Sequence, residues 1–210
     1  MSSHDYVIVG AGSAGCVLAA RLTENDGISV LLLEAGGRDT NPLIHMPLGF
    51  RKVWPDPRLT WGYESEPQPH MDDRRIPIPR GRVLGGSSSI NALVYARGHR
   101  SDYDQWRQMG LEGWGYGDLL PYFKRSEGSW RGESAVHGGA GPVGVSSARW
   151  DDPFFAPFMA AAKASGLGLS EDIHADVQEG FTAGELTVKG GRRHTSRRAW
   201  SASSTPRTGS

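Results

Sequence analysis

The chain has 210 residues, enough for one domain or slightly more. Its 23 basic and 23 acidic residues balance, so net charge gives no reason to expect a nucleic-acid or anionic-membrane partner. Its one cysteine, Cys16, excludes an internal disulfide and favours a reducing compartment. Within a predicted helix, Cys16 is interpreted as a small packed residue rather than a nucleophile.

The chain shows no membrane or export signal. No apolar run approaches the roughly 20 residues that a membrane-spanning helix requires. A core strand is predicted directly after Met1-Ser2-Ser3-His4, without the apolar stretch of a secretory signal. These observations predict a cytoplasmic protein with no transmembrane segment.

The first motif is a glycine-rich turn between a strand and a helix. Tyr6–Val9 is typical of a strand buried on both faces of a parallel sheet, and residues 16–22 are predicted to be helical. Gly10 permits the tight turn, Gly12 lets a pyrophosphate approach the backbone, and Gly15 lets the helix pack on the strand. The helix N-terminus would face the phosphates. The predicted cofactor contacts here are Gly10, Gly12, Ser13, Ala14 and Gly15.

A second strand over residues 28–33 ends at an acidic residue, Glu34. A carboxylate at this point can accept hydrogen bonds from a ribose hydroxyl pair, and its charge disfavours a 2′-phosphate. We place Glu34 and the adjacent Ala35 against the cofactor. Strand, loop, helix, strand and acid together predict an α/β dinucleotide-binding fold, but they do not distinguish FAD from NAD.

The second motif is a glycine- and serine-rich run over residues 81–91, with the sequence GRVLGGSSSIN. Glycine weakens helices and strands, so Gly85 and Gly86 make sense where backbone passes close to a ligand. The serines supply hydroxyl groups and can cap a helix that begins near Ser88, and Arg82 could offset phosphate charge. A flexible linker is the alternative, but apolar neighbours do not suit one. The two loops together predict one large cofactor held at several points.

The run over residues 81–91, continuing to Tyr95 and Gly98, resembles the first signature of the glucose–methanol–choline (GMC) flavoprotein oxidoreductases. The segments 5–10 and 34–37 are similar to the opening of that family. The resemblance covers about residues 5–193 and leans toward the choline-dehydrogenase-like branch. Other similar segments are 61–63, 66–68, 119–123, 137–139 and 141–142.

The resemblance implies a set of cofactor contacts. The first loop and Glu34 would hold the ADP half of FAD, with Trp61 near the adenine. Ile90 stands where some members attach the flavin covalently through a histidine, so we expect non-covalent FAD. Val83, Gly86 and Ser87 would line the pyrophosphate, and Asn91, Ala92, Leu93 and Val94 would approach the flavin ring.

The expected architecture is an α/β, partial Rossmann-like FAD-binding domain of the GMC type, followed by the beginning of a substrate domain. We expect the incomplete FAD-binding domain over residues 1–145 and the start of the substrate domain over 146–196. Residues 197–210 turn to a low-complexity composition and are expected to be disordered. We therefore expect a C-terminally truncated member, whose sheet would keep an unpaired edge.

The remaining segments give coarser predictions. Residues 35–80 are rich in proline and predict a long loop without regular structure, which in a compact domain is usually functional. Helices are predicted over 101–109, with a capping box formed by Ser101 and Asp104, and over 116–126, which Pro121 kinks or restarts. A third helix is predicted over 153–165, with its apolar stripe in the core.

Three functions are compatible with these motifs. The first is an FAD-dependent oxidoreductase that acts on the CH–OH group of a small-molecule substrate, either an alcohol in general or a choline-like one. The second is an inactive remnant that at most binds FAD, because the family's catalytic histidine lies near the C-terminus and no histidine here matches it. The third, an NAD-dependent enzyme, leaves the second loop unexplained. We predict no metal site and no catalytic residue, and expect structural or solvent-facing roles for His99 and His137.

Overall fold

The computed structural model describes residues 3–148, 152–175 and 177–201. The chain divides into two compact units, the first formed by Met1–Leu93 with Val188–Ser210 and the second by Val94–Thr187. These bounds differ from those predicted for the FAD-binding domain (1–145) and for the start of the substrate domain (146–196). The predicted ranges refer to functional domains, which a division into compact units does not test, so they stay predictions. The first unit therefore draws on two separate stretches of the sequence.

The first unit opens with a strand–helix–strand arrangement, as the sequence predicts. Strands β1 (Tyr6–Val9) and β2 (Val30–Leu33) pair in parallel, and α1 (Ser13–Leu22) connects them. Helix α1 begins earlier than expected, because the Cys16 N–H already donates to the Gly12 carbonyl at 3.0 Å. The predicted burial of β1 on both faces is wrong for the described residues: Val9 is 84% exposed. The reason is that this sheet has only two described strands.

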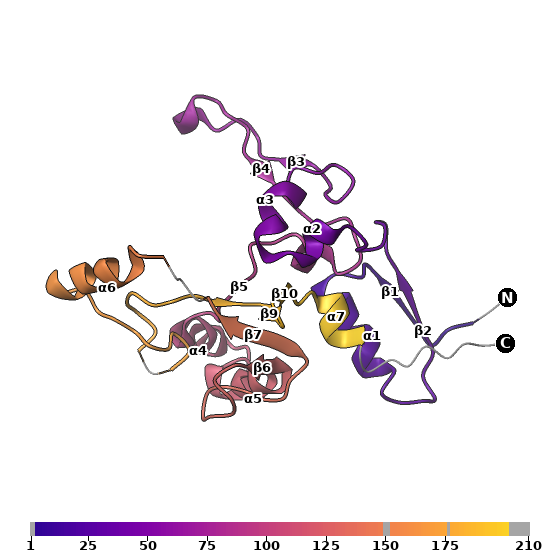
Figure 1. The fold of residues 1–210 in the computed structure, drawn as a ribbon. Coiled ribbons are helices and arrows are strands. Elements are labelled where there is room, and N and C mark those ends of the chain that lie inside the picture. The colour runs from indigo at the N-terminus through magenta and orange to yellow at the C-terminus, as the bar shows by residue number, and fades with distance from the viewer. Residues whose placement is uncertain (1–2, 149–151, 176, 202–210) are drawn as a thin grey trace. The chain divides into compact units, whose positions relative to one another are not determined.

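Residues 35–80 contain short regular elements where a structureless loop was predicted. The Asn41 side chain caps the first helix by accepting a hydrogen bond from the Leu43 N–H at 3.0 Å, and Pro42 occupies the first helical position. The segment between β3 and β4 extends away from α3 (Figure 1). The elements are α2 (Pro42–His45), η1 (Pro47–Gly49), α3 (Phe50–Val53), β3 (Tyr63–Glu64), η2 (Pro69–Met71) and β4 (Pro77–Ile78).

An apolar core fixes the second glycine-rich loop in the first unit. Val83 and Ile90 from this loop pack with Ile44 of α2, Val53 of α3 and Leu59. All five side chains are buried. The apolar residues that flank the glycines therefore anchor the loop, as expected for a shaped loop rather than a linker.

The helix expected near Ser88 is instead a single 3₁₀ turn, η3 (Gly86–Ser89). Gly85 and Gly86 adopt left-handed backbone, with φ of +91° and +55°. The Ser88 hydroxyl donates to the Gly85 carbonyl and the Ser89 hydroxyl to the Leu84 carbonyl. These serines therefore stabilise the loop itself, and no helix begins at Ser88 for them to cap. The Ser88 hydroxyl also accepts a hydrogen bond from the Ser196 N–H, at 2.9 Å.

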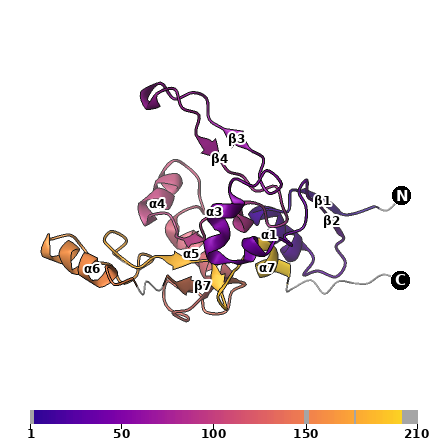
Figure 2. The same ribbon diagram turned by 45° about the horizontal axis from the view of Figure 1, so that its top comes forward.

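The first unit ends with the hairpin β9 (Val188–Lys189) and β10 (Arg192–Arg193), followed by α7 (Ser196–Ser201). Helix α7 lies against α1 in both views (Figures 1 and 2). Trp200 is buried on this contact, and the Arg21 guanidinium lies 4.8 Å from its ring centre. Residues 197–201 are thus helical, not disordered as expected. The rest of the expected tail, 202–210, lies outside the described residues.

The second unit contains a four-stranded sheet in the order β5-β8-β7-β6. Strands β6 and β7 are parallel, and the other neighbours are antiparallel. None of the helices in the described part of the chain is long and apolar enough to cross a membrane. The elements are β5 (Val94–Tyr95), α4 (Arg100–Gln108), α5 (Tyr116–Ser126), β6 (Glu127–Ser129), β7 (Val143–Ser147), α6 (Phe155–Ala164) and β8 (Glu185–Leu186).

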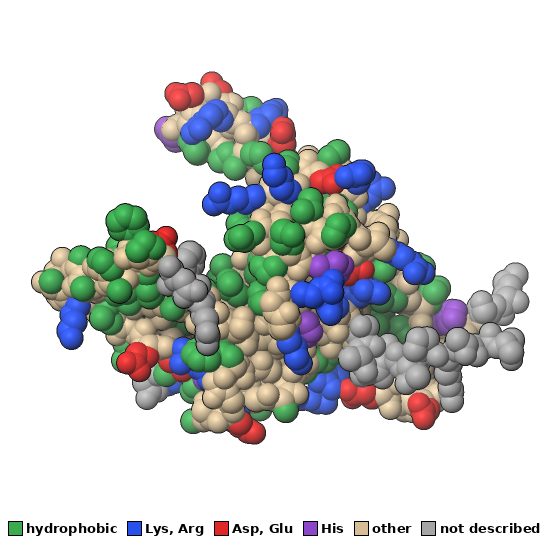
Figure 3. Space-filling model, viewed as in Figure 1, with side chains coloured by type: hydrophobic (Ala, Val, Ile, Leu, Met, Phe, Trp, Pro, Cys, Tyr) green, Lys and Arg blue, Asp and Glu red, His purple; other side chains and the backbone are tan. Residues whose placement is uncertain are grey.

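The three helices of the second unit lie close to their predicted positions. The predicted capping box of α4 is wrong: His99 caps this helix, and its own N–H donates to Asp102 at 3.0 Å. Asp104 instead accepts the Tyr116 N–H at the start of α5, at 3.1 Å. Helix α6 buries only part of its apolar stripe: Ala162 is buried, but the larger Phe158 remains exposed. Apolar side chains accordingly gather over α6 (Figure 3).

Candidate cofactor site

The two glycine-rich loops meet in the first unit. The Gly85 N–H donates to the Ala11 carbonyl at 2.8 Å. A methyl group at Gly86 would lie 2.7 Å from the Gly12 Cα, so this approach requires glycine. At Gly15 a methyl group would collide with the Gly10 carbonyl, which explains the close packing of α1 on β1. The motifs therefore form one structure, with peptide groups in direct contact.

Glu34 fastens the first loop to the end of β2. One carboxylate oxygen accepts the Ala11 N–H at 2.8 Å, and the other accepts the Gly36 N–H at 2.9 Å. Two carboxylate oxygens offer about four acceptor positions, so capacity remains for a pair of hydroxyl groups. Glu34 can thus stabilise the loop and contact a ligand at the same time.

A cavity of about 750 Å³ opens between these elements. This volume lies in the range of roughly 300–1,000 Å³ that is typical of ligand sites. The expected cofactor contacts that line it come from the first loop and the start of α1, the end of β2, the proline-rich segment and the second loop: Gly10, Gly12, Ser13, Glu34, Ala35, Trp61, Gly86 and Ser87. Four more lining residues, Val9, Leu33, Arg80 and Gly81, were not predicted.

The other expected contacts do not line this cavity. The Val83 side chain is in the apolar core, so only its backbone is left to face a ligand. Val94 begins β5 and belongs to the second unit. The remaining ones, Ala14, Gly15, Arg82, Asn91, Ala92 and Leu93, lie in the first unit outside the lining.

Arg80, rather than Arg82, is the cation that lines the cavity. The Arg82 guanidinium lies 5.2 Å from the centre of the Trp61 ring, a cation–π geometry. Trp61 also stacks on Tyr63, with ring centres 6.1 Å apart and planes inclined by 4°. Arg82 therefore supports an aromatic wall, and phosphate charge in the cavity would meet Arg80.

Arg193 is a buried neighbour of Asn91, one of the expected cofactor contacts, and nothing in the sequence singled it out. Its side chain is 0% exposed and donates to the Asn91 side-chain oxygen at 2.8 Å. Burial lowers the pKa of Arg193 to about 10, so the guanidinium stays charged at neutral pH. In the sequence, Arg193 follows two glycines in a short predicted turn, and such a turn is normally exposed. The local sequence therefore offered no indication that this arginine is buried.

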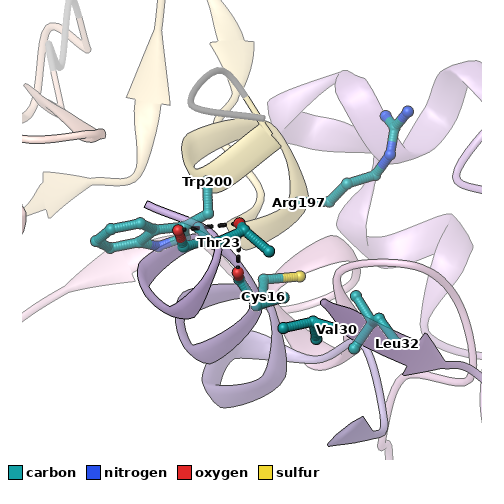
Figure 4. Close-up of a pocket in the computed structure, with 8 residues that line it drawn as sticks. Cys16, Thr23, Val30, Leu32, Arg197 and Trp200 are labelled. Atoms are coloured by element: carbon teal, nitrogen blue, oxygen red, sulfur yellow. Dashed lines mark hydrogen bonds between the residues drawn. The ribbon is translucent and has the colours of Figure 1, made fainter. Parts of the chain in front are cut away.

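A smaller, mostly apolar cavity of about 200 Å³ lies between α1, β2 and α7 (Figure 4). Cys16, Val30, Leu32 and Trp200 contribute to its walls. The Cys16 thiol donates to the Ala11 carbonyl, and burial, reinforced by the Glu34 charge, raises its pKa. The thiol is therefore packed and not activated, in agreement with its sequence interpretation.

The second unit contains a buried polar cluster around His137. Its Nδ1 lies 3.1 Å from Glu127, and its Nε2 lies 2.8 Å from Asp172. Arg97 also binds Glu127 at 2.8 Å. No group of side chains in the described ranges could hold a metal ion. This cluster is in keeping with the structural role expected for His137.

The strand–loop–helix–strand arrangement, with the second loop packed against the first, defines an α/β protein with a Rossmann-like nucleotide-binding fold. The family model described as GMC oxidoreductase matches residues 4–209. The chain therefore belongs to the GMC oxidoreductase family.

Relatives and solved structures agree with this assignment. The chain is 48% identical over 202 residues to an oxygen-dependent choline dehydrogenase of Sinorhizobium fredii, covering 95% of this chain and 35% of the relative. For an oxygen-dependent choline dehydrogenase of Rhizobium etli the identity is 47% over 198 residues, covering 93% of this chain and 36% of the relative. Thus the chain spans about a third of the length of these relatives.

Two solved structures have the same fold over this length. Pyridoxine 4-oxidase from Mesorbium loti gives a TM-score of 0.88 at 36% identity, covering 94% of this chain and 39% of that one. A formate oxidase of Aspergillus oryzae, from a study of FAD modification, gives 0.84 at 32% identity, covering 93% and 36%. The predicted fold class and family are confirmed.

Proposed function

We propose that the first unit binds FAD non-covalently and forms the cofactor-binding part of an oxidoreductase that acts on the CH–OH group of a small, choline-like alcohol. The observation that carries the proposal is the contact between the two glycine-rich loops beside one cavity of about 750 Å³. Membership of the GMC family and the FAD-related neighbours support FAD as the cofactor. The relatives named as choline dehydrogenases suggest the type of alcohol.

Different lining residues suit different parts of FAD. Glu34 is suited to the adenosine ribose, because a carboxylate accepts hydrogen bonds from two hydroxyl groups. Trp61 offers an aromatic face for the adenine. Backbone amides near Gly12 and Gly86, together with the Arg80 guanidinium, are suited to the diphosphate. We assign Ala14, Gly15 and Val83 to shaping these loops.

The residue at position 90 supports non-covalent binding. Ile90 is 1% exposed and packs in the apolar core of the first unit. It offers no nucleophile, and a polar replacement would disturb the core. When bound, FAD would supply the acceptor for the hydride that leaves the alcohol carbon. We assign no side chain of this chain to proton removal from the alcohol.

The proposal is tested by purifying the 210-residue chain, desalting it and measuring flavin absorbance. Retained FAD supports cofactor binding, and anaerobic bleaching on addition of choline supports the alcohol reaction. FAD retained without bleaching by choline or other small alcohols would favour the inactive reading. Retention of NAD without any affinity for FAD would overturn the proposal. For a loss of FAD binding in a Glu34→Gln variant, the matched control is Glu64→Gln, an exposed change on β3.

A further inference from the structure

The guanidinium of Arg193 is buried without an acidic partner among the residues that the structure describes. Its Nε donates to the Ile44 carbonyl at 2.8 Å, and its Nη1 donates to Asn91 at 2.8 Å and to the Ser88 carbonyl at 3.3 Å. Its Nη2 is buried without a hydrogen-bond partner, and no carboxylate among the described residues pairs with it. A buried cation is costly unless an opposite charge and hydrogen bonds offset its lost hydration, and here only hydrogen bonds do so among the described residues. The three contacts join α2, the end of η3 and Asn91.

The contact fixes the orientation of the Asn91 amide. Its oxygen accepts two hydrogen bonds, from Arg193 and from the Leu93 N–H at 3.1 Å. Both neighbours can only donate, so the oxygen must face them. The amide nitrogen and its two N–H groups are left facing away. Asn91 is exposed, so these donors are accessible to a ligand.

The same contact supports an unusual backbone conformation. Leu93 adopts left-handed backbone, with φ of +66°, which is disfavoured for a residue with a Cβ atom. The bond from its N–H to the Asn91 oxygen closes a short turn that holds this conformation. Arg193 therefore reaches Leu93 through Asn91.

We propose that Arg193 is a positioning residue, which holds residues 91–93 in place and presents the Asn91 N–H donors to an acceptor atom of FAD. The part that concerns FAD rests on the proposed function. The part that concerns Arg193, Asn91 and Leu93 rests on the hydrogen bonds alone. The two parts are therefore tested separately.

The first test uses the chain without cofactor and measures hydrogen exchange at the Leu93 amide. Arg193→Gln should speed this exchange about tenfold, the effect of losing one hydrogen bond. Arg193→Lys should give a smaller increase, since lysine keeps the charge but not the planar fork. Arg192→Gln, on the neighbouring exposed arginine, should change nothing. Unchanged exchange in both Arg193 variants would overturn the positioning role.

The second test separates the oxygen of Asn91 from its N–H donors. Asn91→Asp keeps an acceptor for Arg193 and Leu93, so exchange should remain slow, but it removes both donors. FAD affinity should then fall about tenfold, with a shift in the flavin absorbance spectrum. Wild-type affinity and an unchanged spectrum in this variant would overturn the donor role. If the unmodified chain fails to bind FAD, the proposed function and the donor role fail, while the exchange result still decides the positioning role.

Discussion

The Gly85 amide donates to the Ala11 carbonyl and thereby joins two loops that are far apart in the sequence. Each loop alone is a common structure, since a glycine-rich turn after a strand occurs in many nucleotide-binding proteins. Their contact places Gly12 against Gly86 and leaves both beside one cavity. The pair therefore identifies the site more specifically than either motif does.

Replacing Gly86 by alanine should weaken FAD binding strongly. Its φ is +55°, and the added methyl group would lie 2.7 Å from the Gly12 Cα, so one of the two loops must move. We expect at least a tenfold loss of affinity, measured by titrating the protein with FAD and following flavin fluorescence. Gly37→Ala is the control, because nothing lies within 4 Å of its methyl position. Equal affinities of the two variants would contradict the proposed close contact.

Glu34→Gln should loosen the first loop even without a ligand. Glutamine offers one oxygen where the carboxylate offers two, so either the Ala11 or the Gly36 amide loses its acceptor. An unsatisfied buried amide costs about 1–3 kcal/mol, and we expect a loss of this size in the free energy of unfolding. Urea unfolding followed by circular dichroism would measure it. The exposed Glu64→Gln should leave stability within experimental error, and a similar loss there would refute the explanation.

The sequence was sufficient for β1, α1 and β2, because their apolar pattern and the glycines agree on one local structure. Helix α5 has the predicted bounds, with Pro121 inside it. The short elements over 35–80 were missed, since each has only two to four residues and depends on a cap such as Asn41.

Long-range contacts explain why the lining of the candidate site could not be predicted in full. Whether Arg80 or Arg82 lines the cavity depends on where Trp61 lies, which the local sequence does not encode. The burial of Arg193 depends likewise on Ile44 and Asn91, both more than a hundred positions earlier. The glycine pattern could be interpreted because close approach restricts the residue type, whereas an arginine is compatible with many surroundings.

Trp200→Ala should destabilise the first unit. The indole is 8% exposed on the contact between α7 and α1, and it also holds the Arg21 guanidinium. Truncation of a buried tryptophan costs about 3–5 kcal/mol. We expect the free energy of unfolding to drop by about 3 kcal/mol, because this position lies beside a cavity. Trp114→Ala removes an exposed indole of the second unit and should cost much less. Similar unfolding midpoints for both variants would contradict the packing of α7.

The polar cluster of the second unit predicts a loss of stability in acid. His174 is buried between Tyr95 and His137, and it faces Glu185 at 3.7 Å. Burial, and then the Arg97 charge, lower the pKa of His174 below its ordinary value. Burial would raise the pKa of Asp172, but hydrogen bonds from the His174 backbone and from His137 outweigh it and lower that pKa.

Both groups have a lower pKa in the folded than in the unfolded chain, so the unfolded chain takes up more protons as pH falls. The contribution of His174 to the free energy of unfolding is complete above about pH 6.5 and is lost below it. The contribution of Asp172 is lost only below about pH 3.9. The urea midpoint should therefore decline between pH 7.5 and 5. His174→Gln should flatten this decline, because glutamine does not titrate, and the exposed His70→Gln should not. An undiminished decline in His174→Gln would assign the acid sensitivity to another group.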